Sequence, residues 1–258
     1  MKTVILCGGL GTRLKEETEF RPKPMVPIGN RPILWHIMKL YAHYGYKDFI
    51  LALGYKGDMI KEYFHNYELL NNEVTLELGK HDNVTVHQNH NEVGWKITLV
   101  NTGEKALKGA RLKRIEKYID GDDFMMTYGD GIANVDLSAL LKFHRSHGKL
   151  ATVTATTPTS PFGELAIHGD AVQSFVEKPK NGQALINGGF FVFNKGILNY
   201  LTDDDKCDLE YGPLEKIARE GQLKVYQHNG FWACMDTFRD MEYLNKLWNE
   251  GKADWKIW

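Results

Sequence analysis

Several signatures of common protein classes are missing from this chain of 258 residues. Its three cysteines, Cys7, Cys207 and Cys234, are widely spaced and form no C-x-x-C pair, which argues against a disulfide framework or a zinc knuckle. This sparse cysteine usage fits a reducing, cytoplasmic compartment. No hydrophobic run is long enough for a signal-peptide core or a bilayer-spanning helix, so we expect no membrane partner.

The chain also lacks an excess of charge of one sign. Its 32 Lys and Arg residues nearly balance its 33 Asp and Glu residues, and the formal net charge is −1. There is therefore no electrostatic case for a nucleic-acid partner. Apolar residues make up 43% and charged residues 25% of the chain, an ordinary globular profile. With no linker or repeat visible, we expect one domain over residues 1–258.

The first half of the chain alternates strand-like and helix-like patterns. Residues 3–7 and 48–54 are continuous apolar runs, typical of strands buried on both faces of a parallel sheet. Residues 33–45 and 58–67 carry apolar residues at helical spacing. This order predicts an α/β fold in which helices flank a mixed, mostly parallel central sheet.

Two later regions depart from that alternation. Residues 73–101 contain three runs, "VTLEL", "VTVHQ" and "KITLV", in which polar and apolar residues alternate. We expect them to form a small antiparallel insert. Residues 237–258 are expected to form a C-terminal helix and a tail. That tail is rich in tryptophan, which would pack on the core or on another subunit.

The segment from Leu6 to Pro27, "LCGGLGTRLKEETEFRPKPMVP", indicates a phosphate-binding turn. It is neither a P-loop, because G-x-x-x-x-G-K-[ST] is absent, nor a complete G-x-G-x-x-G dinucleotide fingerprint. Its glycines still allow backbone N–H groups to approach an anion closely. Arg13 adds a planar cation suited to polyphosphate, and Lys23 lies between two prolines that stiffen the backbone. A tight turn with two solvated cations remains the alternative.

The motifs "GGLGTRL" and "RPKPMVPIGNRPIL" resemble the N-terminal signature of the sugar-phosphate nucleotidyltransferases. The resemblance continues through "YGDG", "VEKP", "INGGFFVF" and "ACMDTFRD", and so covers most of the chain. It implies a single Rossmann-like domain that joins a sugar 1-phosphate to a nucleoside triphosphate and releases pyrophosphate. It also implies catalytic roles for Arg13 and Lys23. The nucleotide-binding residues that it implies are Leu6, Gly8, Gly9, Leu10, Gly11, Thr12, Arg13, Lys23, Arg111 and Gly129.

Two isolated carboxylates are the candidate ligands of a magnesium ion. Asp130 follows a predicted buried strand, and Asp236 follows another apolar run just before a helix. Hard Mg²⁺ prefers such carboxylates together with phosphate oxygens. Each aspartate could instead serve only its turn or its helix N-terminus. Their match to the family motifs favours the metal role. The reaction expected is an in-line attack by the sugar phosphate on the α-phosphorus, which needs no general base.

The sugar side of the predicted site rests on the resemblance. Glu177 would accept hydrogen bonds from sugar hydroxyls, and Lys178 would bind the sugar phosphate; a surface ion pair is the alternative. Asn187 would offer an amide to the hexose, while Gly188 and Gly163 would let the ring approach the backbone.

The choice of base rests on Arg111. The stretch "KGARLKRIEKY" departs from the G-x-A-x-A type of thymidylyl- and uridylyl-transferring relatives, and "KEET" replaces their P-L-T element. A guanidinium only donates hydrogen bonds, so it suits the paired acceptors of cytosine. The chain resembles the branch of the family that uses CTP and glucose 1-phosphate. That branch supplies CDP-glucose for bacterial surface polysaccharide. Uridylyl or thymidylyl transfer, an exposed helix arginine and a non-catalytic sensor of this fold remain open. The resemblance also implies a homo-oligomer of unspecified size.

Overall fold

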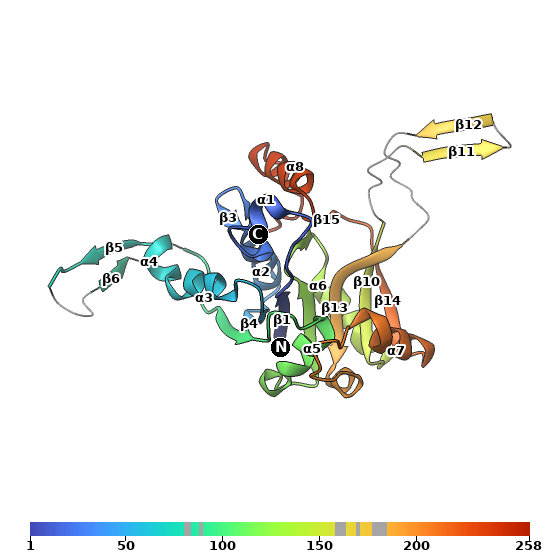
Figure 1. Ribbon diagram of the computed structural model, residues 1–258, viewed down its shortest axis with the longest axis horizontal. Helices are drawn as coiled ribbons and strands as arrows, with labels where there is room; N and C mark the ends of the chain where they lie inside the picture. Colours follow the sequence, from blue (N-terminus) through green and yellow to red (C-terminus); the bar gives the residue numbers. More distant parts are fainter. Residues whose placement is uncertain (80–83, 88–89, 158–163, 169–170, 177–184) are drawn as a thin grey trace.

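The computed structural model describes residues 1–79, 84–87, 90–157, 164–168, 171–176 and 185–258. Within them, seven strands form a central sheet in the order β14-β10-β13-β8-β1-β4-β7 (Figure 1). In that order the strands are β14 (Leu223–His228), β10 (Ala151–Thr156), β13 (Ile186–Asn194), β8 (Asp123–Tyr128), β1 (Lys2–Cys7), β4 (Asp48–Leu53) and β7 (Lys96–Asn101). Only β13 is antiparallel to its neighbours, β8 and β10. The predicted α/β fold with a mixed, mostly parallel sheet is confirmed.

Helices cover both faces of the sheet, which explains the continuous apolar runs of its strands. In β1, Ile5 and Cys7 belong to one buried cluster, whereas Val4 and Leu6 belong to another. The first cluster includes residues of α2 (Ile33–His43), α3 (Gly57–His65), α6 (Leu137–His147) and α8 (Phe238–Asn249). The second includes residues of α5 (Lys108–Arg114), η3 (Lys195–Tyr200) and α7 (Glu215–Arg219). Successive residues of a strand point to opposite faces of the sheet, so the residues on both faces must be apolar.

Shorter elements complete the described chain. They are α1 (Lys15–Thr18), η1 (Lys23–Met25), β2 (Pro27–Ile28), β3 (Arg31–Pro32), α4 (Tyr67–Asn71), β5 (Glu73–Leu76), β6 (Val84–His87), η2 (Glu116–Tyr118), β9 (Gly131–Ala133), β11 (Glu164–His168), β12 (Ala171–Val176), η4 (Glu210–Leu214) and β15 (Trp232–Cys234).

The expected antiparallel insert over residues 73–101 is partly wrong. Strands β5 and β6 do pair antiparallel, and they project from the body of the molecule (Figure 1). Strand β7, however, runs parallel to β4 at the edge of the central sheet, with Lys96 opposite Asp48. An edge strand is half exposed, so β7 carries the same alternation of polar and apolar residues that an antiparallel hairpin would carry.

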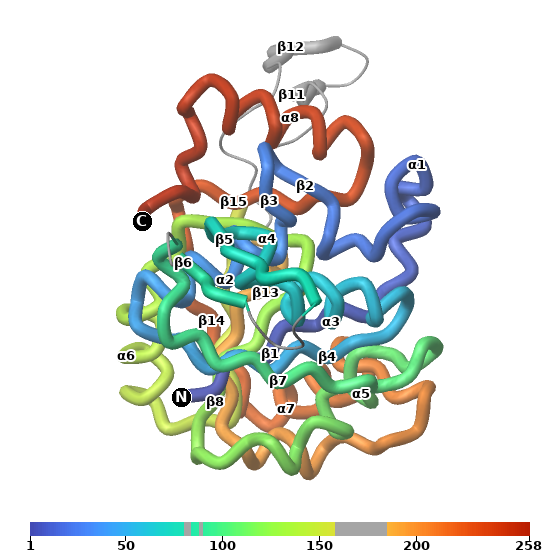
Figure 2. The backbone as a smooth tube through the Cα atoms, turned by 90° about the vertical axis from the view of Figure 1, so that its left-hand side faces the viewer, coloured from blue at the N-terminus to red at the C-terminus, as the bar shows by residue number. Residues whose placement is uncertain are grey.

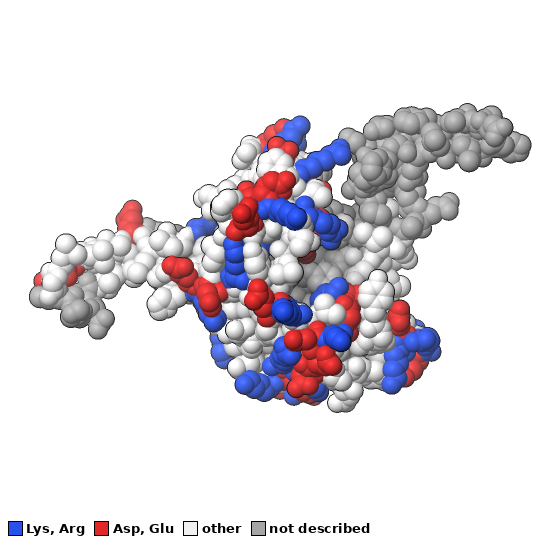
Figure 3. Space-filling view, in the orientation of Figure 1, with Lys and Arg blue, Asp and Glu red and all other residues white. Residues whose placement is uncertain are grey.

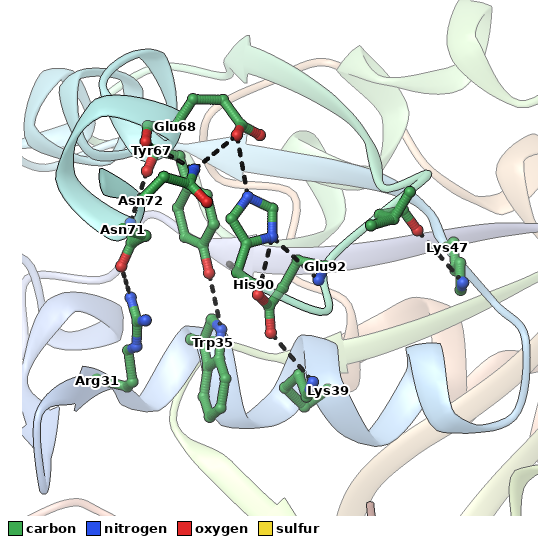
Figure 4. A network of polar contacts seen from close by, with 11 residues as sticks. Arg31, Trp35, Lys39, Lys47, Tyr67, Glu68, Asn71, Asn72, His90 and Glu92 are labelled. Carbon is green, nitrogen blue, oxygen red and sulfur yellow. Dashed lines mark hydrogen bonds and ion pairs between the residues drawn. The ribbon is translucent and has the colours of Figure 1, made fainter. Parts of the chain in front are cut away.

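A polar network joins the base of the β5–β6 hairpin to helix α2 (Figure 4). The imidazole of His90 lies between two carboxylates, 3.0 Å from Glu68 Oε2 and 3.2 Å from Glu92 Oε2. Lys39 of α2 donates to Glu92 Oε1 at 3.0 Å. Both carboxylates of this network are therefore paired, which anchors the segment at residues 90–92 against the body.

The C-terminal segment packs on the core of the same chain. The side chain of Trp255 is almost fully buried and lies beside His36 and Trp248. Asn245 of α8 accepts a hydrogen bond from Gly29 N at 2.8 Å and donates to Pro27 O at 3.2 Å. Helix α8 therefore supports the β2–β3 hairpin, beside which it lies in Figure 2. None of the described helices combines the length and the hydropathy needed to traverse a bilayer.

Candidate active site

A cavity of about 520 Å³ opens at the carboxyl ends of the neighbouring parallel strands β1 and β8. Such ends are where ligands bind in open α/β sheets, at the point where the strand order reverses. The cavity brings together most of the predicted site residues that the structure describes. They are Leu6, Gly8, Gly9, Arg13, Lys23, Arg111, Gly129, Asp130, Asn187, Gly188 and Asp236.

Lys23, Arg13 and the two predicted metal ligands form one charged cluster. Lys23 Nζ donates to Asp130 Oδ2 at 2.8 Å and also to Asp236 Oδ1. Arg13 Nη1 lies 3.1 Å from Asp236 Oδ2, and its side chain remains largely exposed. Burial opposes the charge of Lys23, but the carboxylates of Asp130 and Asp236 outweigh it and raise the pKa of the ammonium. The cluster therefore holds fixed positive charge beside two carboxylates, as phosphoryl chemistry requires.

Close backbone packing sets the position of Lys23 and Asp130. Lys23 begins the short helix η1, whose Pro24 lies against the turn after β8. A Cβ atom on Gly129 would come within 2.9 Å of both Pro24 Cγ and Leu6 O, so only glycine allows this approach. Asp130 O then accepts from Met235 N at 2.9 Å, which joins the β8 turn to the segment before α8.

Asp236 is held by the start of helix α8. Thr237 and Asp240 form a capping box, in which Asp240 Oδ2 accepts from Thr237 N at 2.8 Å. The same oxygen accepts from Asp236 N at 3.0 Å. The cap therefore fixes the backbone of Asp236 as well as the helix N-terminus.

The donor set fits a hard divalent cation. Ligand atoms of Asp130, Cys234 and Asp236 all lie within 4.8 Å of one another, the one such grouping found among the described residues. Burial and the nearby carboxylates raise the pKa of the Cys234 thiol, so it stays protonated and is a poor metal ligand. Two carboxylates remain, which suits oxygen-preferring ions.

His87 and His90 are spaced as H-x-x-H, a pattern that could hold a metal ion, but they have separate partners. His87 Nε2 lies 3.0 Å from Thr75 Oγ1 in the hairpin, whereas His90 lies between Glu68 and Glu92. Both imidazoles are therefore engaged in contacts with the hairpin or its base.

Arg111 is buried rather than exposed on its helix. Its Nη1 donates to Leu53 O at 3.0 Å and to Gly103 O at 2.7 Å, and its Nη2 donates to Gly8 O at 2.9 Å. A Cβ atom on Gly8 or Gly54 would overlap the guanidinium, at 2.1 and 2.4 Å. The two glycines thus make room for a cation that joins the carboxyl ends of β1, β4 and β7.

Three of the predicted loop residues do not line the cavity. Leu10, Gly11 and Thr12 lie in the turn between β1 and α1, and the side chain of Leu10 is half exposed. Gly11 has φ of +65°, and a Cβ atom there would come within 2.5 Å of Thr18 Cγ2. Its glycine is therefore required by the turn itself.

Asn187 and Gly188 of β13 lie in the cavity wall, next to the end of β8. Trp232 Nε1 donates to Gly188 O at 2.7 Å, which fixes that stretch of backbone. The other predicted sugar contacts, Gly163, Glu177 and Lys178, lie outside the described residues.

Sequence reasoning missed half of the cavity wall. The additional lining residues are Cys7, Pro24, Ala106, Leu107, Lys108, Thr127, Tyr128, Gly131, Glu210, Trp232 and Cys234. Several of them lie inside a recognised motif, as Tyr128 and Gly131 lie in "YGDG", and that membership was the available signal. Glu210 adjoins none, because it reaches the cavity only through the tertiary fold.

On the face drawn in Figure 3, acidic and basic side chains are interspersed over the residues drawn in colour.

Comparison with known proteins agrees with this geometry. The model of the family described as nucleotidyl transferase matches residues 2–248. A glucose-1-phosphate cytidylyltransferase of Salmonella typhimurium is 52% identical to this chain, and a protein of Bacillus subtilis named probable glucose-1-phosphate cytidylyltransferase is 44% identical; each alignment covers both chains in full. The crystal structure of HddC from Yersinia pseudotuberculosis superimposes with a TM-score of 0.70 at 25% identity, covering 96% of this chain and 99% of that one. The chain belongs to the nucleotidyl transferase family.

Proposed function

We propose that this protein transfers a cytidylyl group from CTP to α-D-glucose 1-phosphate, giving CDP-glucose and pyrophosphate. The observation that carries the proposal is the full-length similarity, at 52% and 44% identity, to two relatives named for that activity. The cavity supports it with a cluster of two cations and two carboxylates at the ends of β1 and β8. CDP-glucose would then supply the synthesis of surface polysaccharide.

Lys23 and Arg13 are proposed to neutralise the triphosphate. The ammonium of Lys23 is held by two carboxylates and keeps its proton, so it offers fixed charge to the oxygens around the α-phosphorus. Arg13 is exposed at the cavity edge and can close on phosphate with several N–H donors. An anionic oxygen of the sugar phosphate attacks in line, and pyrophosphate leaves, without a proton to remove.

Asp130 and Asp236 are proposed to hold Mg²⁺. When bound, the ion would offset the negative charge that develops during transfer. The two carboxylates bind and orient it, and the capping box of α8 keeps Asp236 in place. The loop residues Leu10, Gly11 and Thr12 are proposed to shape the turn that presents the backbone N–H groups of Gly8 and Gly9.

The base is proposed to lie beside Arg111, and the sugar beside Asn187. Arg111 gives its Nη donors to backbone carbonyls and to the Thr102 hydroxyl, so it shapes the floor of the base site; among the described residues its Nε–H has no hydrogen-bond partner. Gly163, Glu177 and Lys178 keep their proposed contacts with the sugar phosphate.

We also propose a cytoplasmic homo-oligomer. The projecting hairpin exposes Leu76 and Val84, and its loop exposes Leu78, which is 91% exposed. Apolar side chains gathered on one protrusion favour contact with another subunit.

Pyrophosphate release tests the activity. The protein is incubated with glucose 1-phosphate, Mg²⁺ and CTP, UTP, dTTP, ATP or GTP in turn, and each assay is repeated without sugar phosphate. We expect release with CTP that depends on glucose 1-phosphate. Equal or faster release with UTP or dTTP would contradict cytidylyl specificity, and no release with any triphosphate would favour a non-catalytic sensor.

A further inference from the structure

A second polar group of the cavity wall lies outside the phosphate cluster. Tyr128 Oη donates to Glu210 Oε1 at 2.5 Å and accepts from Asn187 Nδ2 at 3.2 Å. Lys108 Nζ lies 2.6 Å from the same Glu210 oxygen. All four residues line the cavity, and they come from β8, β13, η4 and α5.

The direction of these hydrogen bonds is determined by chemistry. Burial and the Glu210 carboxylate raise the pKa of the Tyr128 phenol, so it keeps its single proton. A carboxylate paired with Lys108 can only accept, and so that proton goes to Glu210. The phenol oxygen must then accept from the amide nitrogen of Asn187.

Asn187 is fixed at both ends of its amide. Gly189 N donates to Asn187 Oδ1 at 2.9 Å, and one proton of Nδ2 is given to Tyr128. Among the described residues, the second Nδ2 proton has no hydrogen-bond acceptor, and the residue is exposed to the cavity. The amide therefore presents one N–H donor in a fixed orientation.

The ring of Tyr128 is itself held against β13. Gly189 has φ of +79°, and a Cβ atom there would come within 2.6 Å of Tyr128 Cδ2. Glycine at this position thus lets the ring pack closely against the strand, where its hydroxyl reaches Asn187. Lys108 Nζ also lies 5.6 Å from the ring centroid.

We propose that Glu210 is a positioning residue for sugar recognition, which orients the Asn187 amide toward the hexose of the sugar phosphate through the hydroxyl of Tyr128. The inference rests on the proposed function and adds Tyr128, Glu210 and Lys108 to it. It assigns the network to the sugar phosphate and not to the triphosphate, since Asn187 is the proposed sugar contact.

The test uses Tyr128→Phe, which removes the hydroxyl, and Glu210→Met, which keeps an unbranched side chain and removes the acceptor of the hydroxyl proton. Each variant is expected to raise KM for glucose 1-phosphate about tenfold, as loss of one oriented hydrogen bond does, and to change KM for CTP less than about twofold. The double variant is expected to resemble the single variants, because Glu210 acts through Tyr128.

Tyr200 and Glu220 give a matched control. They form the same phenol–carboxylate contact, at 2.7 Å, outside the cavity. Tyr200→Phe and Glu220→Met should leave both KM values unchanged. An equal rise in KM for CTP, or an unchanged KM for glucose 1-phosphate, would overturn the inference.

Calorimetric binding of glucose 1-phosphate separates this inference from the proposed function. If wild type binds the sugar phosphate but releases no pyrophosphate, the proposed activity fails while the variants still report on the network through their dissociation constants. If wild type and both variants bind it equally, the network has no part in sugar recognition.

Discussion

Arg111→Met removes the guanidinium that joins three strand ends while keeping an unbranched apolar stem. In the wild-type structure this group donates to Leu53 O, Gly8 O, Gly103 O and Glu104 O, at 3.0, 2.9, 2.7 and 3.1 Å. These carbonyls stand at or just after the carboxyl ends of β4, β1 and β7. Losing the cation should therefore loosen the cavity floor.

The magnitude follows from the carbonyls that lose their donor. Leu53 O keeps hydrogen bonds from Thr102 N and Thr102 Oγ1, at 2.9 and 2.6 Å, whereas Gly8 O, Gly103 O and Glu104 O lose the charged one. Each such loss costs roughly 1–3 kcal/mol, and water from the adjoining cavity favours the lower end. The sum is about 3 kcal/mol, which lowers Tm by roughly 6–12 °C in a protein of this size.

Arg114→Met is the matched control on the same helix. Arg114 donates to Thr102 O at 2.7 Å and to Asp203 O at 2.5 Å, and it pairs with Asp205 at 2.9 Å. Its side chain is 31% exposed, so water replaces these contacts and the expected cost is about 1 kcal/mol. Scanning calorimetry and denaturant unfolding measure both variants. Equal melting temperatures for the two, or no loss for Arg111→Met, would refute the reasoning.

Three further outcomes are expected. His36 is neutral because burial lowers its pKa to about 4, so below pH 6.5 the unfolded chain binds a proton at this residue that the folded chain does not bind; between pH 7.5 and 5 the free energy of unfolding should fall by about 2 kcal/mol more in wild type than in His36→Gln, in which the buried His144 and the half-buried His147 still contribute. Asp240→Ala should cost about 1 kcal/mol and raise the Mg²⁺ concentration for half-maximal rate, whereas the cap variant Asp136→Ala in α6 should cost similar stability with normal turnover. Asp130→Asn or Asp236→Asn should lower kcat at least about a hundredfold in the pyrophosphate assay, and near-normal turnover in either would remove that residue from the proposed metal site.

Local patterns predicted the sheet because its strands are buried on both faces. The apolar runs of β1, β4 and β8 can be recognised as strands without knowing which strands lie beside them. The turns after β1 and β8 carry the glycine and aspartate motifs. The resemblance to a known family then joined Gly8, Lys23 and Asp130 in one site, and the three line the same cavity.

Other features depended on tertiary partners that the sequence does not name. The alternation in β7 is the same for a sheet edge as for a hairpin, so only pairing with β4 distinguishes them. Arg111 has the basic neighbours of an exposed helix face, yet Gly8 and Gly54 open a buried passage for its guanidinium. Glu210 enters the cavity wall from a kinked segment with no motif of its own.

A competition assay addresses the central claim most directly. Wild-type protein, glucose 1-phosphate and Mg²⁺ are mixed with equal concentrations of CTP, UTP and dTTP, and the sugar nucleotides are identified by mass spectrometry. CDP-glucose should be the dominant product, formed together with an equal amount of pyrophosphate. Dominant UDP-glucose or dTDP-glucose, or no sugar nucleotide at all, would contradict the account.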